Sequence, residues 1–165
     1  MNESLKQALQ EQLTRERQNE ATYRAKAAQA DAANYPGVAM WMRRSADDEH
    51  MHGQLIQGYL INRNEVPIYN SLEIIDTLPG EDLIALFQDA LELEQATTTA
   101  LATLYYIAEQ AEDPQSCSFL IVPHGEFPGF MEEQTESERD IADILTTLRR
   151  VDKTGWMLFD RALLG

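Results

Sequence analysis

Glu49 and His52 stand three positions apart, a spacing that places a carboxylate and an imidazole side by side on one face of a helix. Two further glutamates, Glu16 and Glu94, and the amide of Gln134 lie in other segments rich in helix-forming residues. Carboxylate oxygens with one imidazole suit Fe(II), Mn(II) or Zn(II) better than metals that prefer thiolates. These residues indicate a divalent-metal centre, provided that the fold brings their segments together.

Long stretches of Ala, Leu, Glu and Gln, which favour helices, lie between a few clusters of proline and glycine. The pattern predicts an all-α chain with four long helices and a short one at its end. The expected ranges are 3–32, 38–62, 81–111, 130–152 and 155–164.

Proline and glycine also suggest where the helices begin and how they connect. The Pro-Gly pair at 36–37 opens the second helix, and the Pro-Gly-Glu-Asp run at 79–82 places acids in the first turn of the third. The segment 62–79 lacks helical period, so we expect it to cross the length of a bundle. The whole chain, 1–165, is expected to form a single domain.

Each long helix carries a mainly apolar face with alternating spacings of four and three residues, which is typical of helices that point into a bundle. The first face is Leu5, Leu9, Gln12, Glu16, Asn19, Tyr23, and the second is Val38, Met42, Ser45, Glu49, His52, Ile56, Tyr59. The third is Leu83, Phe87, Ala90, Glu94, Thr97, Leu101, Leu104, Ala108, and the fourth is Phe130, Gln134, Ser137, Ile141, Ile144, Leu148, Val151. A polar or ionisable group interrupts each face near its middle. The five candidate site residues are therefore predicted to meet at one level of one core.

Burying three unpaired carboxylates is costly, and they repel one another. The four faces offer no Lys or Arg around the cluster, and three protonated acids would use core volume poorly. A pair of divalent cations would satisfy all of them. The alternative for each residue taken singly is a solvated or partly exposed position, and for Tyr23 a purely structural place in the core.

The chain has 13 Lys and Arg against 28 Asp and Glu, a formal charge of −15. Such an acidic protein repels phosphate backbones and anionic lipid surfaces, which argues against nucleic-acid and membrane partners. No apolar run approaches the roughly 20 residues of a membrane span, and no secretory signal is apparent. Cys117 is the single cysteine and forms no internal disulfide, so we expect a cytoplasmic protein.

With these features the sequence resembles ferritin over nearly its whole length. The motifs that carry the resemblance are Leu-Gln-Glu-Gln-Leu-Thr-Arg-Glu (9–16), Asp-Asp-Glu-His-Met-His (47–52), Glu-Leu-Glu-Gln (92–95), Asp-Pro-Gln-Ser-Cys-Ser-Phe-Leu (113–120), Glu-Glu-Gln (132–134) and Phe-Asp-Arg-Ala-Leu-Leu-Gly (159–165). The resemblance implies a four-helix bundle with a long crossover between helices two and three and a short fifth helix. It also implies a homo-oligomeric, 24-subunit hollow cage. In each subunit a ferroxidase centre would oxidise Fe(II) with dioxygen or peroxide and pass ferric oxide to the cavity.

By matching position, the resemblance assigns roles to individual residues. Glu16, Glu49 and His52 would hold a first iron, and Glu49 would bridge to a second iron bound by Glu94. Gln134 would bond nearby water or oxidant. The remaining implied roles are an electron donor at Tyr23 and a third iron position at Asp48, Glu133 and Glu136.

The chain departs from its relatives at several positions. Ser137 replaces a further carboxylate of the third iron position, which weakens that site, and no second Glu-x-x-His pair occurs. In bacterioferritin the haem-ligating Met directly follows the bridging Glu, whereas here His50 does, so we expect no haem. Alternatives to storage are a ferritin-like di-metal enzyme that activates oxygen, or a catalytically silent cage subunit.

The segment 121–129 is longer than the corresponding connection in relatives, and its two prolines and two glycines predict an interrupted or late-starting fourth helix. In relatives this region lines a channel with acids. Here Ser118 and Ile121 occupy those positions, so the loop is either a neutral surface or a rebuilt negative entrance at Glu126, with His124 beside it. The apolar end of the chain is expected to pack around a symmetry axis through Trp156, Leu158, Phe159, Leu163 and Leu164.

Overall fold

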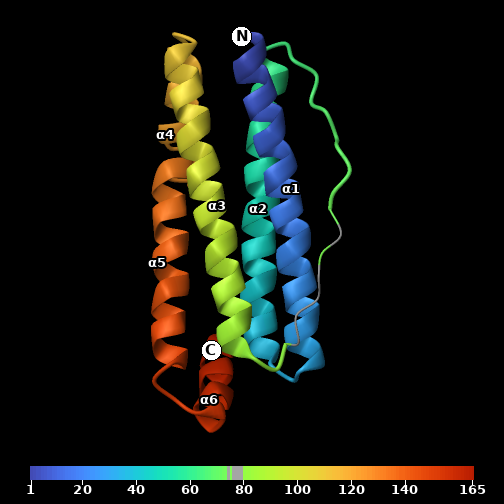
Figure 1. The fold of residues 1–165 in the computed structure, drawn as a ribbon, viewed down its shortest axis with the longest axis vertical. Helices are drawn as coiled ribbons and strands as arrows, with labels where there is room; N and C mark the ends of the chain where they lie inside the picture. Colours follow the sequence, from blue (N-terminus) through green and yellow to red (C-terminus); the bar gives the residue numbers. More distant parts are fainter. Residues whose placement is uncertain (74, 76–79) are drawn as a thin grey trace.

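The computed structural model describes residues 1–73, 75 and 80–165. Its helices are α1 (Glu3–Ala32), α2 (Pro36–Asn62), α3 (Leu83–Gln110), α4 (Pro114–Ile121), α5 (Phe130–Leu148) and α6 (Lys153–Leu164). In Figure 1, α1, α2, α3 and the α4–α5 pair run side by side along the long axis, with α6 below them. The described part of the chain contains no named strand, so the all-α prediction is confirmed, as is the four-helix bundle with a short final helix.

Short polar side chains start most of these helices by accepting the backbone N–H groups of the first turn. Asn2 caps α1, Asp82 caps α3 and Asp113 caps α4. The prediction that acids occupy the first turn of α3 was wrong, because Asp82 is the cap and the first turn contains no acid. Pro79, which belonged to that prediction, lies outside the described residues.

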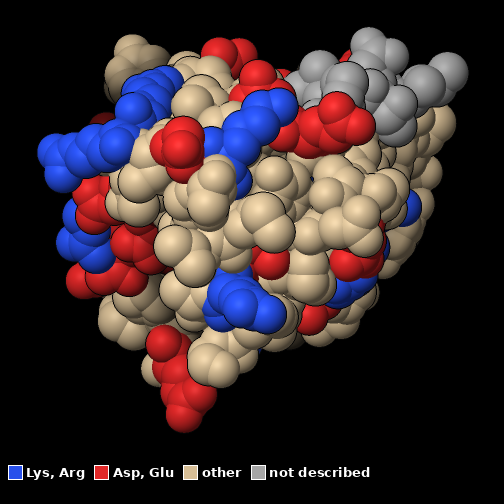
Figure 2. Space-filling model, turned by 90° about the horizontal axis from the view of Figure 1, so that it is seen from below, with Lys and Arg blue, Asp and Glu red and all other residues tan. Residues whose placement is uncertain are grey.

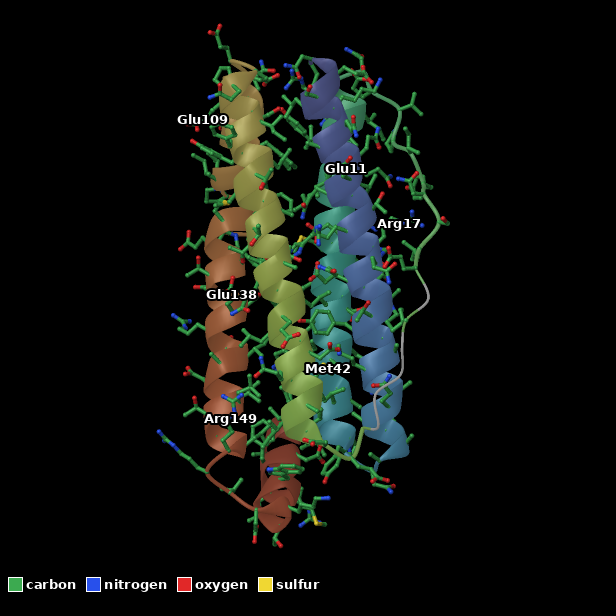
Figure 3. The ribbon with its side chains drawn as sticks, in the orientation of Figure 1. Glu11, Arg17, Met42, Glu109, Glu138 and Arg149 are labelled. Carbon is green, nitrogen blue, oxygen red and sulfur yellow. The ribbon has the colours of Figure 1, made fainter. Side chains whose placement is uncertain are left out.

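The described start of the crossover from α2 to α3, residues 63–73, runs along the outer side of α1 (Figure 1), whereas residues 74 and 76–79 of the predicted crossover lie outside the described residues. Glutamines of α1 bind its backbone: Gln10 Nε2 donates to Val66 O at 2.9 Å and Gln18 Oε1 accepts from Glu73 N at 2.7 Å. Arg17, labelled in Figure 3 on this side of α1, lies 4.5 Å from the centre of the Tyr69 ring. Side chains of α1 thereby supply hydrogen bonds to the extended backbone of residues 66–73.

The fourth rod of the bundle consists of α4, a loop over residues 122–129, and α5. The predicted interruption is confirmed, whereas α4 as a separate helix was not predicted. Gly129 has a φ of 108°, and a Cβ there would lie 2.9 Å from Ile121 O, so the chain re-enters the helix through a position that favours glycine. The predicted end at residue 152 was wrong: α5 stops at Leu148, and Val151, expected on the buried face, is exposed.

The core consists of two hydrophobic clusters at opposite ends of the bundle. The lower cluster includes Tyr23, Met42 and Phe87, and the upper includes Leu9, Ile56 and Phe130. Figure 3 shows Met42 between the helices in the lower half. Every residue predicted on the inner face of α3 is buried, as are those of α1. On α2, Ser45 and Tyr59 are only partly buried.

Helix α6 closes the lower end of the bundle. Trp156 Nε1 donates to Leu148 O at 3.1 Å, and Asp160 Oδ1 accepts from Val38 N at 2.8 Å. A Cβ at Gly37 would lie 1.9 Å from Asp160 O, so only glycine permits this approach. The other face of α6 is open to solvent: Leu158 is 66% exposed, and Figure 2 shows uncharged atoms over much of this end.

Among the described residues, none of the helices has the length and apolar content needed to cross a membrane.

Candidate metal centre

A layer of polar side chains separates the two hydrophobic clusters. All five residues predicted to meet at mid-height are buried, with at most 5% of each exposed; they are Glu16 on α1, Glu49 and His52 on α2, Glu94 on α3 and Gln134 on α5. Polar groups at this depth need partners, because an unpaired buried charge costs several kcal/mol. Their contacts therefore indicate what the layer can bind.

Glu16, Glu49 and His52 form the tightest group, in which one ligand atom from each residue lies within 4.8 Å of the others. His52 Nδ1 is 3.4 Å from Glu49 Oε2 and 3.9 Å from Glu16 Oε2. Within the described chain, Glu16 Oε2 and His52 Nε2 are buried and have no hydrogen-bond partner. Two buried carboxylates and an imidazole, with Glu16 Oε2 left unpaired among them, fit a divalent cation.

Glu94 is bound differently. The Tyr23 hydroxyl donates to Glu94 Oε1, and Gln134 Nε2 donates to Glu94 Oε2 at 2.6 Å and to Glu94 O at 3.2 Å. Both carboxylate oxygens therefore already have partners, whereas Glu16 has a partner for Oε1 alone. The layer is asymmetric, with one group open to a ligand and one saturated by hydrogen bonds.

A cavity of about 310 Å3 opens on one side of this layer. Its walls include Glu49, His52 and Glu94, together with Tyr23 and Trp41. The residues with implied third-site roles line the same cavity: Asp48, Glu133 and Glu136. Glu133 Oε2 is 3.6 Å from His52 Nε2, and Ser137 Oγ donates to Glu133 Oε1 at 2.9 Å, so Ser137 orients the Glu133 carboxylate.

Burial dominates the electrostatics of the layer. It raises the pKa of Glu16 well above its usual range, with the Glu49 charge as the next cause, and raises that of Glu49 to about 8. Burial also raises the pKa of Glu94, and burial followed by the Glu94 charge raises that of Tyr23. The Tyr23 hydroxyl thus keeps its proton at neutral pH, and ionising the carboxyl groups at this depth is costly unless a cation neutralises them.

These shifts predict the pH dependence of stability when no cation is bound. The folded chain holds protons on Glu49 that the unfolded chain has released above pH 4.5, so stability falls as pH rises toward about 8. We expect the urea midpoint of chelator-treated protein to drop over this range, and saturating Zn(II) to remove the drop. Glu49→Gln is the matched control, since it keeps the shape and lacks the titration. An equally steep drop in Glu49→Gln would contradict the assignment of the effect to Glu49.

Several residues of the layer had no role in the sequence-based prediction. Gln12 Nε2 donates to Glu16 Oε1 at 2.6 Å, and Asn19 Nδ2 donates to Glu49 Oε1 at 3.3 Å. Both stand on the predicted inner face of the first helix, four residues before and three after Glu16. That position was the feature of the sequence that could have indicated their contact with the carboxylates. Trp41 packs edge to face on Tyr23, with ring centres 6.4 Å apart.

The two residues of the 122–129 loop predicted to form a negative entrance, Glu126 and His124, differ in exposure and in contacts. Glu126 is exposed, whereas His124 Nε2 lies 2.7 Å from Phe119 O and its ring packs on Phe119. The imidazole is thus part of the loop's own structure. A negative entrance at this loop stays a prediction that would rest on Glu126.

A helical bundle with a layer of carboxylates and an imidazole buried at mid-height is the architecture of the ferritin-like carboxylate proteins. The Ferritin family model, described as a ferritin-like domain, matches residues 6–151. The chain therefore belongs to the ferritin family, and the resemblance seen in its motifs is confirmed.

Relatives and solved structures agree with this membership. The bacterial non-heme ferritin of Staphylococcus haemolyticus is 29% identical over 151 residues, covering 92% of this chain and 86% of the relative. That of Staphylococcus aureus strain USA300 is 27% identical, covering 99% and 95%. The open pore ferritin of the archaeon Archaeoglobus fulgidus has a TM-score of 0.91 at 24% identity, covering 99% and 97%, which shows the shared fold.

Proposed function

We propose that the protein is an iron-storage ferritin whose subunit oxidises Fe(II) with dioxygen or peroxide and deposits ferric oxide inside a homo-oligomeric, 24-subunit cage. The observation that carries this proposal is the buried group of Glu16, Glu49 and His52, in which Glu16 Oε2 lacks a hydrogen-bond partner among the described residues. Membership of the ferritin family supports the metal as iron.

In this proposal, Glu16, Glu49 and His52 bind the first iron and Glu49 is shared with a second, dinuclear position at Glu94. The second iron is held more loosely, because binding it must displace hydrogen bonds that Tyr23 and Gln134 donate to Glu94.

Tyr23 and Gln134 act beside the metal rather than as its main ligands. Tyr23 is buried against Glu94 and supplies an electron to the oxidant, and Gln134 orients Glu94. Asp48, Glu133 and Glu136 offer a weaker third iron position on the cavity wall. The chain acts as a single domain in the cytoplasm, without haem, nucleic acid or membrane as partners.

The chemistry of the cavity favours iron over an organic substrate. Its lining includes six carboxylates, at Asp48, Glu49, Glu94, Glu133, Glu136 and Asp140. Pockets for organic molecules are predominantly apolar with few polar groups. A di-metal enzyme acting on an organic substrate is thus the weaker candidate.

Aerobic addition of Fe(II) to the iron-free protein tests the proposal. Storage predicts rapid appearance of ferric absorbance, with iron that coelutes with the protein in large excess over the number of subunit centres. A silent subunit would show only slow background oxidation, and an enzyme would oxidise iron without retaining it. Either of these results would contradict the storage function.

A further inference from the structure

Asn19 and Thr97 face each other between α1 and α3 at the level of the candidate metal centre. Each is only 1% exposed. Asn19 Nδ2 donates to Thr97 Oγ1 at 2.9 Å and to Glu49 Oε1 at 3.3 Å. One amide group thereby links three helices beside the carboxylate that both metal positions would share.

The direction of these hydrogen bonds is determined by Thr97. Its hydroxyl donates to Leu93 O at 3.1 Å, so its oxygen is left as an acceptor. Asn19 must then present its NH2 group to Thr97, and the second proton of that group points to Glu49. The reverse orientation would bring the Asn19 carbonyl against a carboxylate and leave two buried acceptors unpaired, which is costly.

Glu16 and Glu49 are held in parallel ways. A carboxamide of α1 binds Oε1 of each: Gln12 binds Glu16 and Asn19 binds Glu49. In both residues Oε2 is the oxygen that faces His52 Nδ1, at 3.9 and 3.4 Å. The two amides thus direct one oxygen of each carboxylate toward the same point.

We propose that Asn19, oriented by Thr97, is a positioning residue that fixes the Glu49 carboxylate so that its Oε2 is preset for the metal held with Glu16 and His52. This inference rests on the proposed function, because it assumes that these three residues bind a metal. Removing a hydrogen-bond partner of a metal ligand typically lowers metal affinity by about 10- to 100-fold. The pair is thus expected to act on affinity rather than on folding.

Two substitutions of Thr97 separate positioning from packing. Thr97→Val keeps the shape and removes the hydroxyl, whereas Thr97→Ser keeps the hydroxyl and removes a methyl group. The measurement is anaerobic titration of the iron-free, assembled protein with Co(II), followed by its visible ligand-field absorption, with thermal midpoints recorded in parallel. We expect Thr97→Val to weaken the tightest Co(II) site about 10-fold and alter its spectrum, and Thr97→Ser to bind as the wild type does.

Asn19→Ala is expected to weaken Co(II) binding at least as much as Thr97→Val. Adding Thr97→Val to Asn19→Ala should cause no further loss, because Thr97 acts through Asn19. Wild-type affinity in Thr97→Val, or a larger loss in Thr97→Ser than in Thr97→Val, would overturn the positioning role.

Glu49→Ala distinguishes this failure from failure of the centre itself. If Co(II) binding depends on Glu49 but not on the Thr97 hydroxyl, the centre stands and the positioning role falls. If Glu49→Ala binds Co(II) as the wild type does, the centre is wrong and the positioning role falls with it.

Discussion

Replacing Glu49 by alanine is expected to abolish the rapid phase of Fe(II) oxidation and to slow the initial rate by more than about 100-fold. Loss of a hydrogen-bond partner of a ligand costs up to about 100-fold, and loss of the ligand itself is expected to cost more. The reason is geometric. Glu49 Oε2 lies 3.4 Å from His52 Nδ1 within the group of Glu16, Glu49 and His52, while the Glu49 side chain also lines the cavity that Glu94 shares. Its removal takes a ligand from both proposed irons.

The folded cage should survive this change. Burial raises the pKa of Glu49, so its loss removes a group whose ionised form is costly to bury when no cation is present. Stopped-flow oxidation measures the rate, and light scattering confirms assembly. Glu49→Gln tests the charge at constant volume, and Glu132→Ala, an exposed glutamate on α5, is the matched control expected to oxidise iron normally. A normal initial rate in Glu49→Ala would refute the site.

Removal of residues 156–165 is expected to convert the large assembly into small oligomers and to lower the thermal midpoint. The deletion would remove two kinds of contact, those within the subunit and those between subunits. Trp156 and Asp160 hold α6 against α5 and α2 within one subunit, so their loss uncovers the lower hydrophobic cluster. The exposed face of α6 would lose any contact with neighbouring subunits.

A surface substitution separates these two effects. Leu158 is 66% exposed and Met157 is 64% exposed, so charging Leu158 disturbs no contact within the subunit core. Leu158→Lys should therefore retain helical circular dichroism and the thermal midpoint of a folded bundle while reducing the particle size in light scattering. An intact cage in both the truncated chain and Leu158→Lys would show that α6 does not contribute to assembly.

Several features follow from sequence alone because they depend on local spacing. Every position of α3 that the alternation of four and three residues predicted to be buried is buried, including Glu94 and Thr97. The same period placed Glu16 and Asn19 on the buried face of α1. Helix period is a property of neighbouring residues, so it survives in the sequence without knowledge of the partner helices.

The ends of elements were predicted less well. Val151 continues the apolar spacing of the fourth helix, yet α5 stops at Leu148 so that the chain can turn into α6. Helix α4 begins at Pro114 with Asp113 as its cap, and Arg63 of the α2 end binds that carboxylate at 2.6 Å, lowering the pKa of Asp113 to about 2. The start of α4 thus carries a contact with a residue 50 positions away in sequence, which helical period does not reveal.

Sequence determined most of the side chains that enter the core, and their height in it, because both follow from helical period and from where each helix begins. Tertiary structure decided which polar atoms meet there. Spacing gives no reason for Asn19 to bond Thr97 rather than solvent, or for Gln134 to bind Glu94 rather than a distant group. A hydrogen bond needs donor and acceptor within about 3 Å, and the relative rotation and separation of packed helices set that distance.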